Sequence, residues 1–254
     1  CRPLGSGRPT GSFRSSVKRD SMKLVLIPCP IAEQTSAQVL PEEVRQAVSQ
    51  CKHFLVENVR TARRFISELK LGVQIDELTF EILDKDTDKK TVSDFFNKYN
   101  SVESIGVISE AGCPGVADPG ALAVAIAQEK GIEVLPLVGP SSILLALMAS
   151  GFSGQMFRFH GYLPIDRAAR IRRIEMLQKD VEKLGETQLF IETPYRNNAM
   201  LEDLIQQLPG NQLLSIGCNI QDPTGFTQTK TLKQWSEEKP DLHKKPCIFL
   251  LGRS

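Results

Sequence analysis

Residues 105–130 read IGVISEAGCPGVADPGALAVAIAQEK. The segment opens with a short apolar run, Ile105 to Ile108, that is typical of a buried strand. A loop rich in glycine and proline follows from Ser109 to Gly120, and an alanine-rich run from Ala121 to Lys130 predicts a helix that ends before Gly131. A strand, a long loop and a helix in this order are the repeating unit of a parallel α/β sheet.

The same alternation extends from this segment toward the N-terminus and on to about residue 150. We predict strands at residues 23–27, 53–56, 78–83, 105–108 and 132–137, and helices at 41–50, 61–70, 91–98, 121–130 and 143–150. Strands separated by helices make right-handed crossover connections, so this half of the chain should form a mostly parallel sheet.

The pattern changes after Gly151. We predict strands at residues 157–162, 187–191, 213–218, 228–231 and 247–251, with a long charged helix at 168–184, a helix at 198–207 and a short helix around Trp235. Neighbouring late strands with short connections indicate a mixed sheet. The expected fold is therefore two α/β domains, 22–152 and 153–254, with a ligand cleft between them.

Residues 1–21 differ from the rest in composition. They are rich in Gly, Ser, Pro and Arg and show no hydrophobic periodicity, so we expect a tag-like or disordered extension that precedes a native start at Met22. A mitochondrial transit peptide is the alternative, because the stretch is rich in Arg and Ser and poor in acids. With five basic residues and one acidic residue in this stretch, the remainder carries a formal charge of about −3. A mildly acidic body indicates that any RNA contact comes from a local patch.

Several classes of protein are disfavoured by composition. The apolar stretches are far shorter than the roughly 20 residues that span a bilayer, so we expect no membrane association. Six cysteines occur without a C-x-x-C pair, which favours reduced thiols in a cytoplasmic protein. The three histidines are dispersed, and we predict no metal site.

Three loops that follow predicted strands carry most of the chemical signal: residues 28–31, 109–120 and 138–142. Ligands of open parallel sheets bind beyond the carboxyl ends of the strands, so these loops should line one pocket. None of them contains the glycine pattern of a dinucleotide site or a phosphate-binding P-loop. Stiff proline turns and bare backbone amides instead suit adenine, ribose and a small zwitterion, and the alternative is that each loop is only a tight turn.

In sequence and in order, the loops resemble the tetrapyrrole (corrin/porphyrin) methylase family, and within it the branch of ribosomal RNA small-subunit methyltransferase I. That branch shows P-T-P-I-G-N, S-D-A-G-T-P-x-x-x-D-P-G and P-L-x-G-P-x-x, which the stretches 28–31, 109–120 and 136–142 resemble. Its later elements S-G-[LF], G-[FY]-L-P and Y-E-[SA]-x-x-R resemble residues 150–152, 161–164 and 191–196. The twelve-residue loop ending in Asp118-Pro119-Gly120 is the most specific of these matches.

The resemblance implies an S-adenosylmethionine-dependent methyltransferase that releases S-adenosylhomocysteine, needs no metal and forms a homodimer. For the acceptor it implies a ribose 2′-hydroxyl of small-subunit ribosomal RNA, and hence RNA or a ribosomal subunit as partner. It also implies the residues of the donor site, which are Pro28, Pro30, Glu110, Gly112, Cys113, Val116, Ser141, Ser142, Glu192 and Thr193.

Candidate residues for the acceptor side come from charge and position. If the acceptor is a hydroxyl, Glu192 or Glu110 could accept its proton as the new bond forms. The basic residues at the start of the long helix could neutralise phosphates, or they could be a solvated helix face; they are Arg167, Arg170, Arg172 and Arg173. Tyr195 and Arg196 lie beside the expected cleft, where a substrate contact and a helix-capping role are both open.

Departures from the branch pattern leave alternatives open. The sequence has Ala32-Glu33 for Gly-Asn, Glu110 for Asp and Cys113 for Thr, and residues 217–222 lack most charges of the corresponding family segment. One alternative is a methyltransferase for a tetrapyrrole or another small molecule. The other is a donor-binding ribosome-assembly factor without catalysis.

Overall fold

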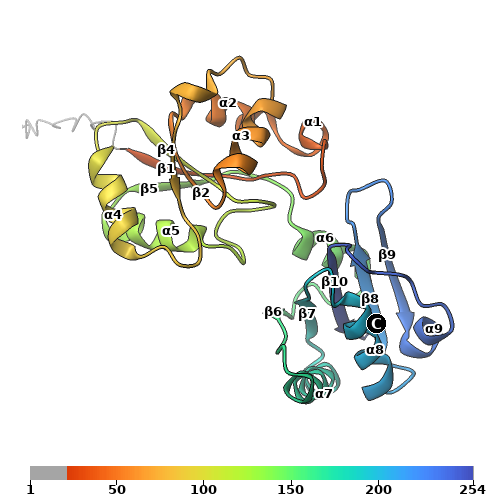
Figure 1. Cartoon of the computed structure of the whole chain (residues 1–254). Helices are drawn as coiled ribbons and strands as arrows, with labels where there is room; N and C mark the ends of the chain where they lie inside the picture. The colour runs from red at the N-terminus through yellow and green to blue at the C-terminus, as the bar shows by residue number, and fades with distance from the viewer. Residues whose placement is uncertain (1–21, 254) are drawn as a thin grey trace, which may run out of the picture.

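The computed structural model describes residues 22–253, so the extension expected at residues 1–21 lies outside the described part. Within residues 22–253 the chain forms two five-stranded sheets, each with its own helices, that lie side by side (Figure 1). The predicted fold class is confirmed: the first sheet is parallel and the second is mixed.

The first sheet has the strand order β3-β2-β4-β1-β5, and every neighbouring pair is parallel. The strands are β1 (Lys23–Ile27), β2 (His53–Val56), β3 (Thr79–Ile82), β4 (Ser104–Ile108) and β5 (Glu133–Pro136). Because β1 lies between β4 and β5, the loops that follow these three strands emerge side by side at one edge of the sheet.

Helices cover both faces of this sheet, which explains why its strands are apolar on both sides. On one face lie α1 (Ser36–Val39), α2 (Glu42–Gln50) and α3 (Val59–Glu68), and on the other lie α4 (Lys89–Lys98) and α5 (Gly120–Glu129). Strand β1 shows the alternation, since Val25 and Ile27 pack in one core and Leu24 in the other. A single turn of 3₁₀ helix, Ile75–Glu77, precedes β3.

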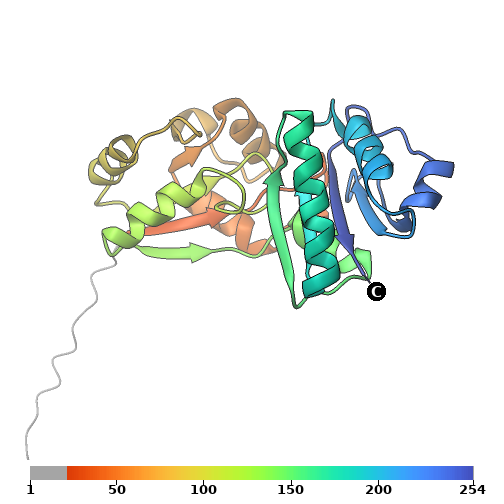
Figure 2. The same cartoon turned by 90° about the horizontal axis from the view of Figure 1, so that it is seen from below.

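The second sheet has the strand order β6-β7-β10-β8-β9. Its strands are β6 (Phe157–Tyr162), β7 (Thr187–Ile191), β8 (Leu213–Cys218), β9 (Phe226–Thr231) and β10 (Cys247–Gly252). Only the pair β6–β7 is parallel among the described strands of this sheet, and α7 (Arg167–Leu184) makes the crossover between them. Figure 2 shows α7 running alongside β6.

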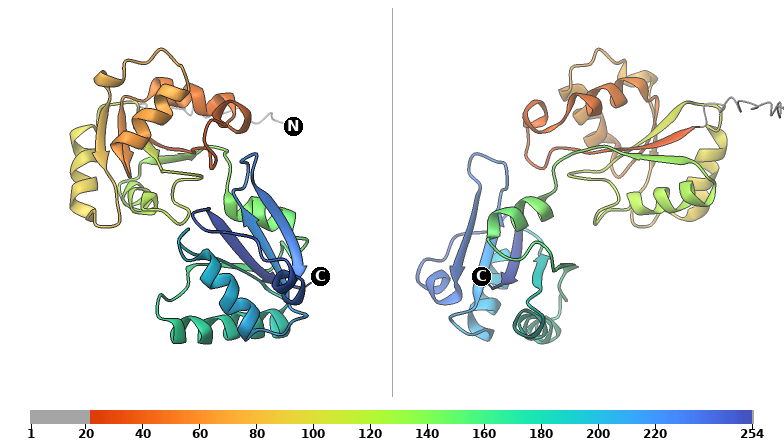
Figure 3. Two further views of the ribbon diagram at one scale, coloured as in Figure 1. Left: turned by 45° about the vertical axis from the view of Figure 1, so that its right-hand side comes forward. Right: turned by 180° about the vertical axis from the view of Figure 1, so that it is seen from behind.

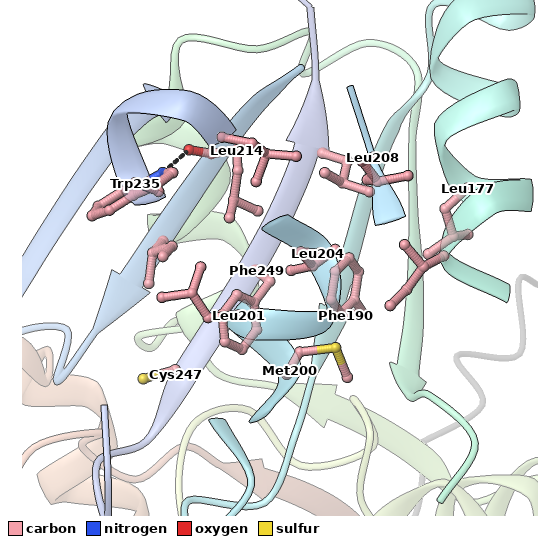
Figure 4. Close-up of a cluster of buried hydrophobic side chains, with 14 of the residues drawn as sticks. Leu177, Phe190, Met200, Leu201, Leu204, Leu208, Leu214, Trp235, Cys247 and Phe249 are labelled. Atoms are coloured by element: carbon pink, nitrogen blue, oxygen red, sulfur yellow. Dashed lines mark hydrogen bonds between the residues drawn. The ribbon is translucent and has the colours of Figure 1, made fainter. Parts of the chain in front are cut away.

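One face of the second sheet is buried under α7, α8 (Asn197–Gln207) and α9 (Leu232–Glu237). Figure 4 shows this core, in which Phe190 and Phe249 stack on neighbouring strands with ring centroids 5.7 Å apart. The buried Trp235 donates its indole N–H to the carbonyl oxygen of Leu214 at 2.9 Å, so α9 is fixed to β8 by packing and by a satisfied polar group.

Helix α6 (Ser142–Ser150) covers the opposite face of the second sheet. It follows the first sheet in the chain, yet its buried Ala146 and Leu147 pack with Leu189, Ile248 and Leu250 of the second sheet. The two views in Figure 3 show α6 apart from α7 and α8, across the strands of the second sheet. The division into domains at residues 152 and 153 stays a prediction.

No helix within residues 22–253 is both long enough and apolar enough to cross a membrane.

Candidate functional site

The three loops identified in the sequence interlock at the edge of the first sheet. Cys29 and Gly112 exchange two backbone hydrogen bonds of 2.9 and 3.0 Å, which join loop 28–31 to loop 109–120. The Cys113 thiol donates to the carbonyl oxygen of Pro140 at 3.3 Å and so joins loop 109–120 to loop 138–142. Gly139 lies against the ring of Pro28, where a side chain would have no room. The three loops therefore form one unit.

Loop 109–120 holds its shape through Asp118. One carboxylate oxygen accepts backbone N–H groups from Gly115 at 2.6 Å and Gly120 at 2.7 Å, which closes the loop at the start of α5. Gly112 and Gly115 have φ of +73° and +83°, a conformation that glycine adopts without steric cost. Burial raises the pKa of the Asp118 carboxyl, while the two backbone donors act in the opposite direction.

A cavity of about 350 Å³, the first cavity, lies between these loops and the second sheet. Its lining from the first half of the chain includes Gly112, Cys113 and Val116, and also Ser141 and Ser142 at the start of α6. The second sheet contributes the ends of β6, β7, β8 and β10 through Tyr162, Glu192, Gly217, Ile220, Pro246, Cys247 and Ile248. The cavity is thus built from both halves of the chain.

Glu192 is the buried carboxylate of the first cavity. Its side chain is 1% exposed, and its Oε1 accepts hydrogen bonds from the Thr193 backbone N–H and from two nitrogens of Arg196, at 2.6, 3.0 and 2.6 Å. The ion pair with Arg196 and the backbone N–H of Thr193 fix the position of this carboxylate in the cavity wall. Arg196 therefore positions Glu192. Its side chain makes no capping hydrogen bond at the start of α8, although the residue occupies the N-cap position.

A second cavity of about 690 Å³ adjoins the first, and both are lined by Ile31 and Ala111. Its wall carries Glu110, Thr61, Arg64 and Lys70, so it is more polar than the first cavity. Glu110 is exposed, accepts from the Thr61 hydroxyl at 3.4 Å, and donates its backbone N–H to Glu57 at 3.1 Å. Burial raises the pKa of Glu57, which the nearby Asp118 and Glu110 charges reinforce.

The sequence-predicted donor residues separate into three groups. Gly112, Cys113, Val116, Ser141, Ser142 and Glu192 line the first cavity. Pro30 and Glu110 line the second. Pro28 is buried behind Gly139, and Thr193 contacts the site through its backbone bond to Glu192. The two carboxylates considered as proton acceptors, Glu192 and Glu110, thus lie in different cavities.

The arginines at the start of α7 do not share one environment. Arg172 is exposed, and Arg167 is mostly exposed while its Nε contacts Asp203 at 2.9 Å. Arg173 donates to Nδ1 of His160 at 2.9 Å.

Arg170 is buried at 8% exposure and pairs with Asp203 at 2.7 Å, and it also donates to the carbonyl oxygen of Ile165 at 2.9 Å. Its burial corrects the assignment of Arg170 to the substrate-contacting set, because its guanidinium is used inside the protein.

Tyr195 stands at the rim of the first cavity, next to Pro194, which lines it. The residue is 70% exposed and packs edge to face on His243, with ring centroids 5.8 Å apart. The backbone N–H of Lys244 donates to the carbonyl oxygen of Pro194 at 3.0 Å, so the loop before β10 is fixed beside the loop after β7.

Among the described residues, no group of three or more His, Cys, Asp or Glu side chains is arranged to hold a metal ion. The polar groups of the first cavity are instead a buried carboxylate, hydroxyls and backbone amides, which suit an organic zwitterion.

Solved structures with a similar fold include methyltransferases. The structure of uroporphyrin-III C-methyltransferase from Thermus thermophilus, complexed with S-adenosylhomocysteine, matches with a TM-score of 0.55 and 13% identity over 91% of this chain and 97% of that one. At this identity the match shows the fold alone.

Curated relatives are more specific. The chain is 27% identical over 189 residues to ribosomal RNA small subunit methyltransferase I of Vibrio cholerae, covering 74% of this chain and 62% of the relative. It is 36% identical over 131 residues to the protein of the same name from Mesorhizobium japonicum, covering 52% and 43%. The chain thus spans less than two thirds of the length of these relatives. No family model matches the chain, but the predicted resemblance to this methyltransferase branch is confirmed.

The sequence did not indicate most of the second-sheet residues that line the first cavity. The residues concerned are Phe159, Tyr162, Ile191, Pro194, Ile220, Pro246, Cys247 and Ile248. The family resemblance includes residues 191–196 and 217–222, which lie near strand ends. Their position was the one signal in the sequence that they could line the cavity. For Pro246 to Ile248 no local pattern distinguishes a cavity wall from an ordinary buried strand.

Proposed function

We propose that this chain is an S-adenosylmethionine-dependent methyltransferase whose substrate is small-subunit ribosomal RNA. The observation that carries the proposal is the first cavity, in which the three interlocked loops meet a buried carboxylate from the second sheet. Similarity to ribosomal RNA methyltransferases and a fold shared with a methyltransferase solved with S-adenosylhomocysteine support it.

The first cavity fits the donor in size and in chemistry. A volume of about 350 Å³ lies in the range of small-molecule sites, roughly 300 to 1,000 Å³. Gly112, Cys113 and Val116 offer backbone and apolar surface, and Ser141 and Ser142 offer hydroxyls. The Glu192 carboxylate, held in position by Arg196 and Thr193, offers an acceptor oxygen to a cationic or hydroxylated part of the ligand. Bound there, the donor would supply a methyl group already activated on a sulfonium centre.

The second cavity is our proposed place for the acceptor, because it adjoins the first at Ile31 and Ala111. A ribose 2′-hydroxyl is the proposed target. Glu110 is the better proton acceptor of the two candidates, since it is exposed in the second cavity, whereas Glu192 is buried and paired with Arg196. The role of this chain is then to hold the hydroxyl close to the first cavity and to accept its proton.

The RNA surface that we propose runs from the start of α7 to the rim of the first cavity. Arg167, Arg172 and Arg173 supply positive charge, and Arg196 lies behind the rim. Tyr195 supplies an exposed ring on which an unpaired base can stack, with Lys244 beside it. Phosphate contact and base stacking together are typical of single-stranded RNA recognition.

We also propose a homodimer in the cytoplasm. Exposed apolar side chains on β5 and α6, among them Leu135, Leu144 and Met148, support a self-association surface. Sedimentation of the purified protein would test the dimer. The proposed domain limits remain 22–152 and 153–254.

Methylation mapping in ribosomal RNA from a deletion strain tests the function. We expect one ribose methylation of the small subunit to be lost and to return when the chain is supplied on a plasmid. Calorimetry should show binding of S-adenosylhomocysteine to the purified chain.

Unchanged methylation with turnover of a tetrapyrrole would establish the small-molecule alternative. Donor binding without any transfer would favour the assembly-factor alternative.

A further inference from the structure

Cys218 and Cys247 face each other across two antiparallel strands. They are direct register partners at the end of β8 and the start of β10. The next pair outward, Asn219 and Pro246, is joined by a backbone hydrogen bond of 3.0 Å, so the cysteine pair occupies a non-hydrogen-bonded position. At such positions the Cα atoms are about 4.5 Å apart and the side chains lie on one face.

That separation is within the range that a disulfide requires, roughly 4.4 to 6.8 Å between Cα atoms. Both side chains point into the same core, where Cys218 is 1% and Cys247 is 7% exposed. Figure 4 shows Cys247 at the edge of this core, beyond Leu201 and Phe249. The backbone therefore needs little movement to join the two sulfur atoms.

The first cavity reaches the strand ends that carry the pair. Cys247 lines that cavity together with its neighbours Pro246 and Ile248, and Gly217 precedes Cys218 in the same wall. The hydrogen bond between the thiols lowers the pKa of Cys218, and the same contact with burial raises the pKa of Cys247. The two thiols are therefore close enough to influence each other, and the Cys247 thiol also donates to the carbonyl oxygen of Lys245 at 3.5 Å.

We propose that Cys218 and Cys247 are a covalent modification site that forms a reversible cross-strand disulfide with a small organic disulfide as oxidant. The Cys247 sulfur attacks one sulfur of the reagent, which forms a mixed disulfide, and the Cys247 proton goes to the reagent thiolate that leaves. The Cys218 sulfur then attacks the Cys247 sulfur of the mixed disulfide, and the Cys218 proton goes to the second reagent thiolate that leaves. Two protein thiols are oxidised and one reagent disulfide is reduced to two thiols, which balances the step.

The disulfide would tie β8 to β10 at the wall of the first cavity, and it would enclose the β8–β9 connection, β9 and α9. Constraining a loop of this length in the unfolded chain stabilises the folded state. We expect the thermal midpoint to rise by roughly 5–10 °C on oxidation and to return after reduction.

The test is treatment of the folded full chain with 2-hydroxyethyl disulfide, followed by alkylation, trypsin digestion and mass spectrometry without reductant. Trypsin cleaves at lysines between the two cysteines, so their peptides stay together only if a disulfide joins them. We expect one linked pair, lighter than the two free peptides by two hydrogen atoms.

Two variants sharpen the result. Cys218→Ser should leave Cys247 with a reagent adduct and no linked pair, whereas Cys51→Ser, which removes a buried thiol of the first half, should leave the link unchanged. Absence of the linked peptides in the parent protein, or a link that persists in Cys218→Ser, would overturn the proposal. The outcome does not depend on whether the chain methylates RNA.

Discussion

At the scale of single residues, Gly139 is the position in the site that we expect to tolerate a side chain least. Its missing side chain makes room for the ring of Pro28, and both residues belong to the interlocked loops. We expect Gly139→Ala to lower the free energy of unfolding by about 1–3 kcal/mol, because neither the backbone nor the proline ring can yield easily. Affinity for S-adenosylhomocysteine should fall as well, since the loops carry the first cavity.

Urea denaturation and calorimetry measure the two effects of Gly139→Ala. Gly154→Ala is the matched control, because its added methyl group would meet nothing within 4 Å. Equal stability of the two variants would show that loop 28–31 can move away from Gly139 at no cost.

His160 predicts a pH dependence of stability. Its Nε2 contacts the Gln188 side-chain oxygen at 2.6 Å, and Nδ1 accepts from Arg173 at 2.9 Å, an arrangement that requires the neutral ring. Burial lowers the pKa of His160, and the Arg173 charge adds to this, whereas the Gln188 contact opposes it. The folded chain therefore binds the proton more weakly than the unfolded chain. The resulting stability is present above the unfolded pKa of about 6.5 and is lost as the pH falls.

Denaturation at about pH 7.5 and about pH 5.5 tests this pH dependence. We expect His160→Gln to lose less stability on acidification than the parent does, and His243→Gln, at an exposed histidine, to lose as much as the parent. A parent and a His160→Gln variant with the same pH profile would contradict the assignment.

Sequence reasoning places single residues well where glycine and proline limit the backbone. The loop ending at Gly120 lines the first cavity through Gly112, Cys113 and Val116, and the role of these residues in donor binding stays a prediction. Sequence reasoning fails for Arg170, because the sequence of a charged helix does not show whether an arginine faces water or a buried partner. Only the fold brings Asp203 to it from α8.

At the scale of elements, the Arg170–Asp203 pair connects α7 to α8. Asp203 accepts from Arg170 on one oxygen and from Arg167 on the other, and Arg170 also holds the turn at Ile165. We expect Arg170→Ala to destabilise the chain by about 3–5 kcal/mol, because it leaves the Asp203 carboxylate buried without its main partner.

Chemical denaturation would measure this loss, with Arg172→Ala on the exposed face of the same helix as control, expected within about 0.5 kcal/mol of the parent. The double variant Arg170→Met with Asp203→Leu should recover much of the stability, since it removes both charges. A single variant as stable as the Arg172→Ala control would show that the pair contributes little.

Hydrophobic periodicity predicts the elements better than it predicts their ends. The predicted helix at 168–184 and strand at 213–218 correspond to α7 and β8 within one residue. Helix α1, with four residues, and the 3₁₀ turn at Ile75–Glu77 were missed, because neither is long enough to show a period or has a side-chain cap at its start.

At the scale of the whole molecule, strand order decides what the site contains. Alternating strands and helices predict a parallel sheet, but not that β1 lies between β4 and β5, or that β10 lies between β7 and β8. Those positions depend on contacts between residues far apart in the chain. They bring the three loops together and place Glu192, Gly217 and Cys247 opposite them.

The proposed division of the molecule into a donor cavity and an RNA surface predicts that RNA affinity depends on salt and donor affinity does not. Each phosphate contact releases counterions, so the affinity for single-stranded RNA should fall steeply as salt increases. Donor affinity should hardly change, because the donor lies within the cavity rather than on the screened surface. Removing two cations, Arg172→Ala with Lys244→Ala, should flatten the slope of log affinity against log salt by about 0.7 for each phosphate that the variant no longer neutralises.

Tyr195→Ala should instead weaken RNA binding at every salt concentration without changing that slope, since stacking releases no counterions, and Tyr195→Phe should restore it. Lys52→Ala is the control for loss of a positive charge, because Lys52 directly precedes β2, at the end of the first sheet away from the three loops. Fluorescence anisotropy with a short RNA and calorimetry with S-adenosylhomocysteine measure the two sites separately. If the double variant and Lys52→Ala gave the same slope while the RNA still bound, the RNA surface would lie elsewhere. If donor and RNA affinities fell together in the double variant, the division itself would be wrong.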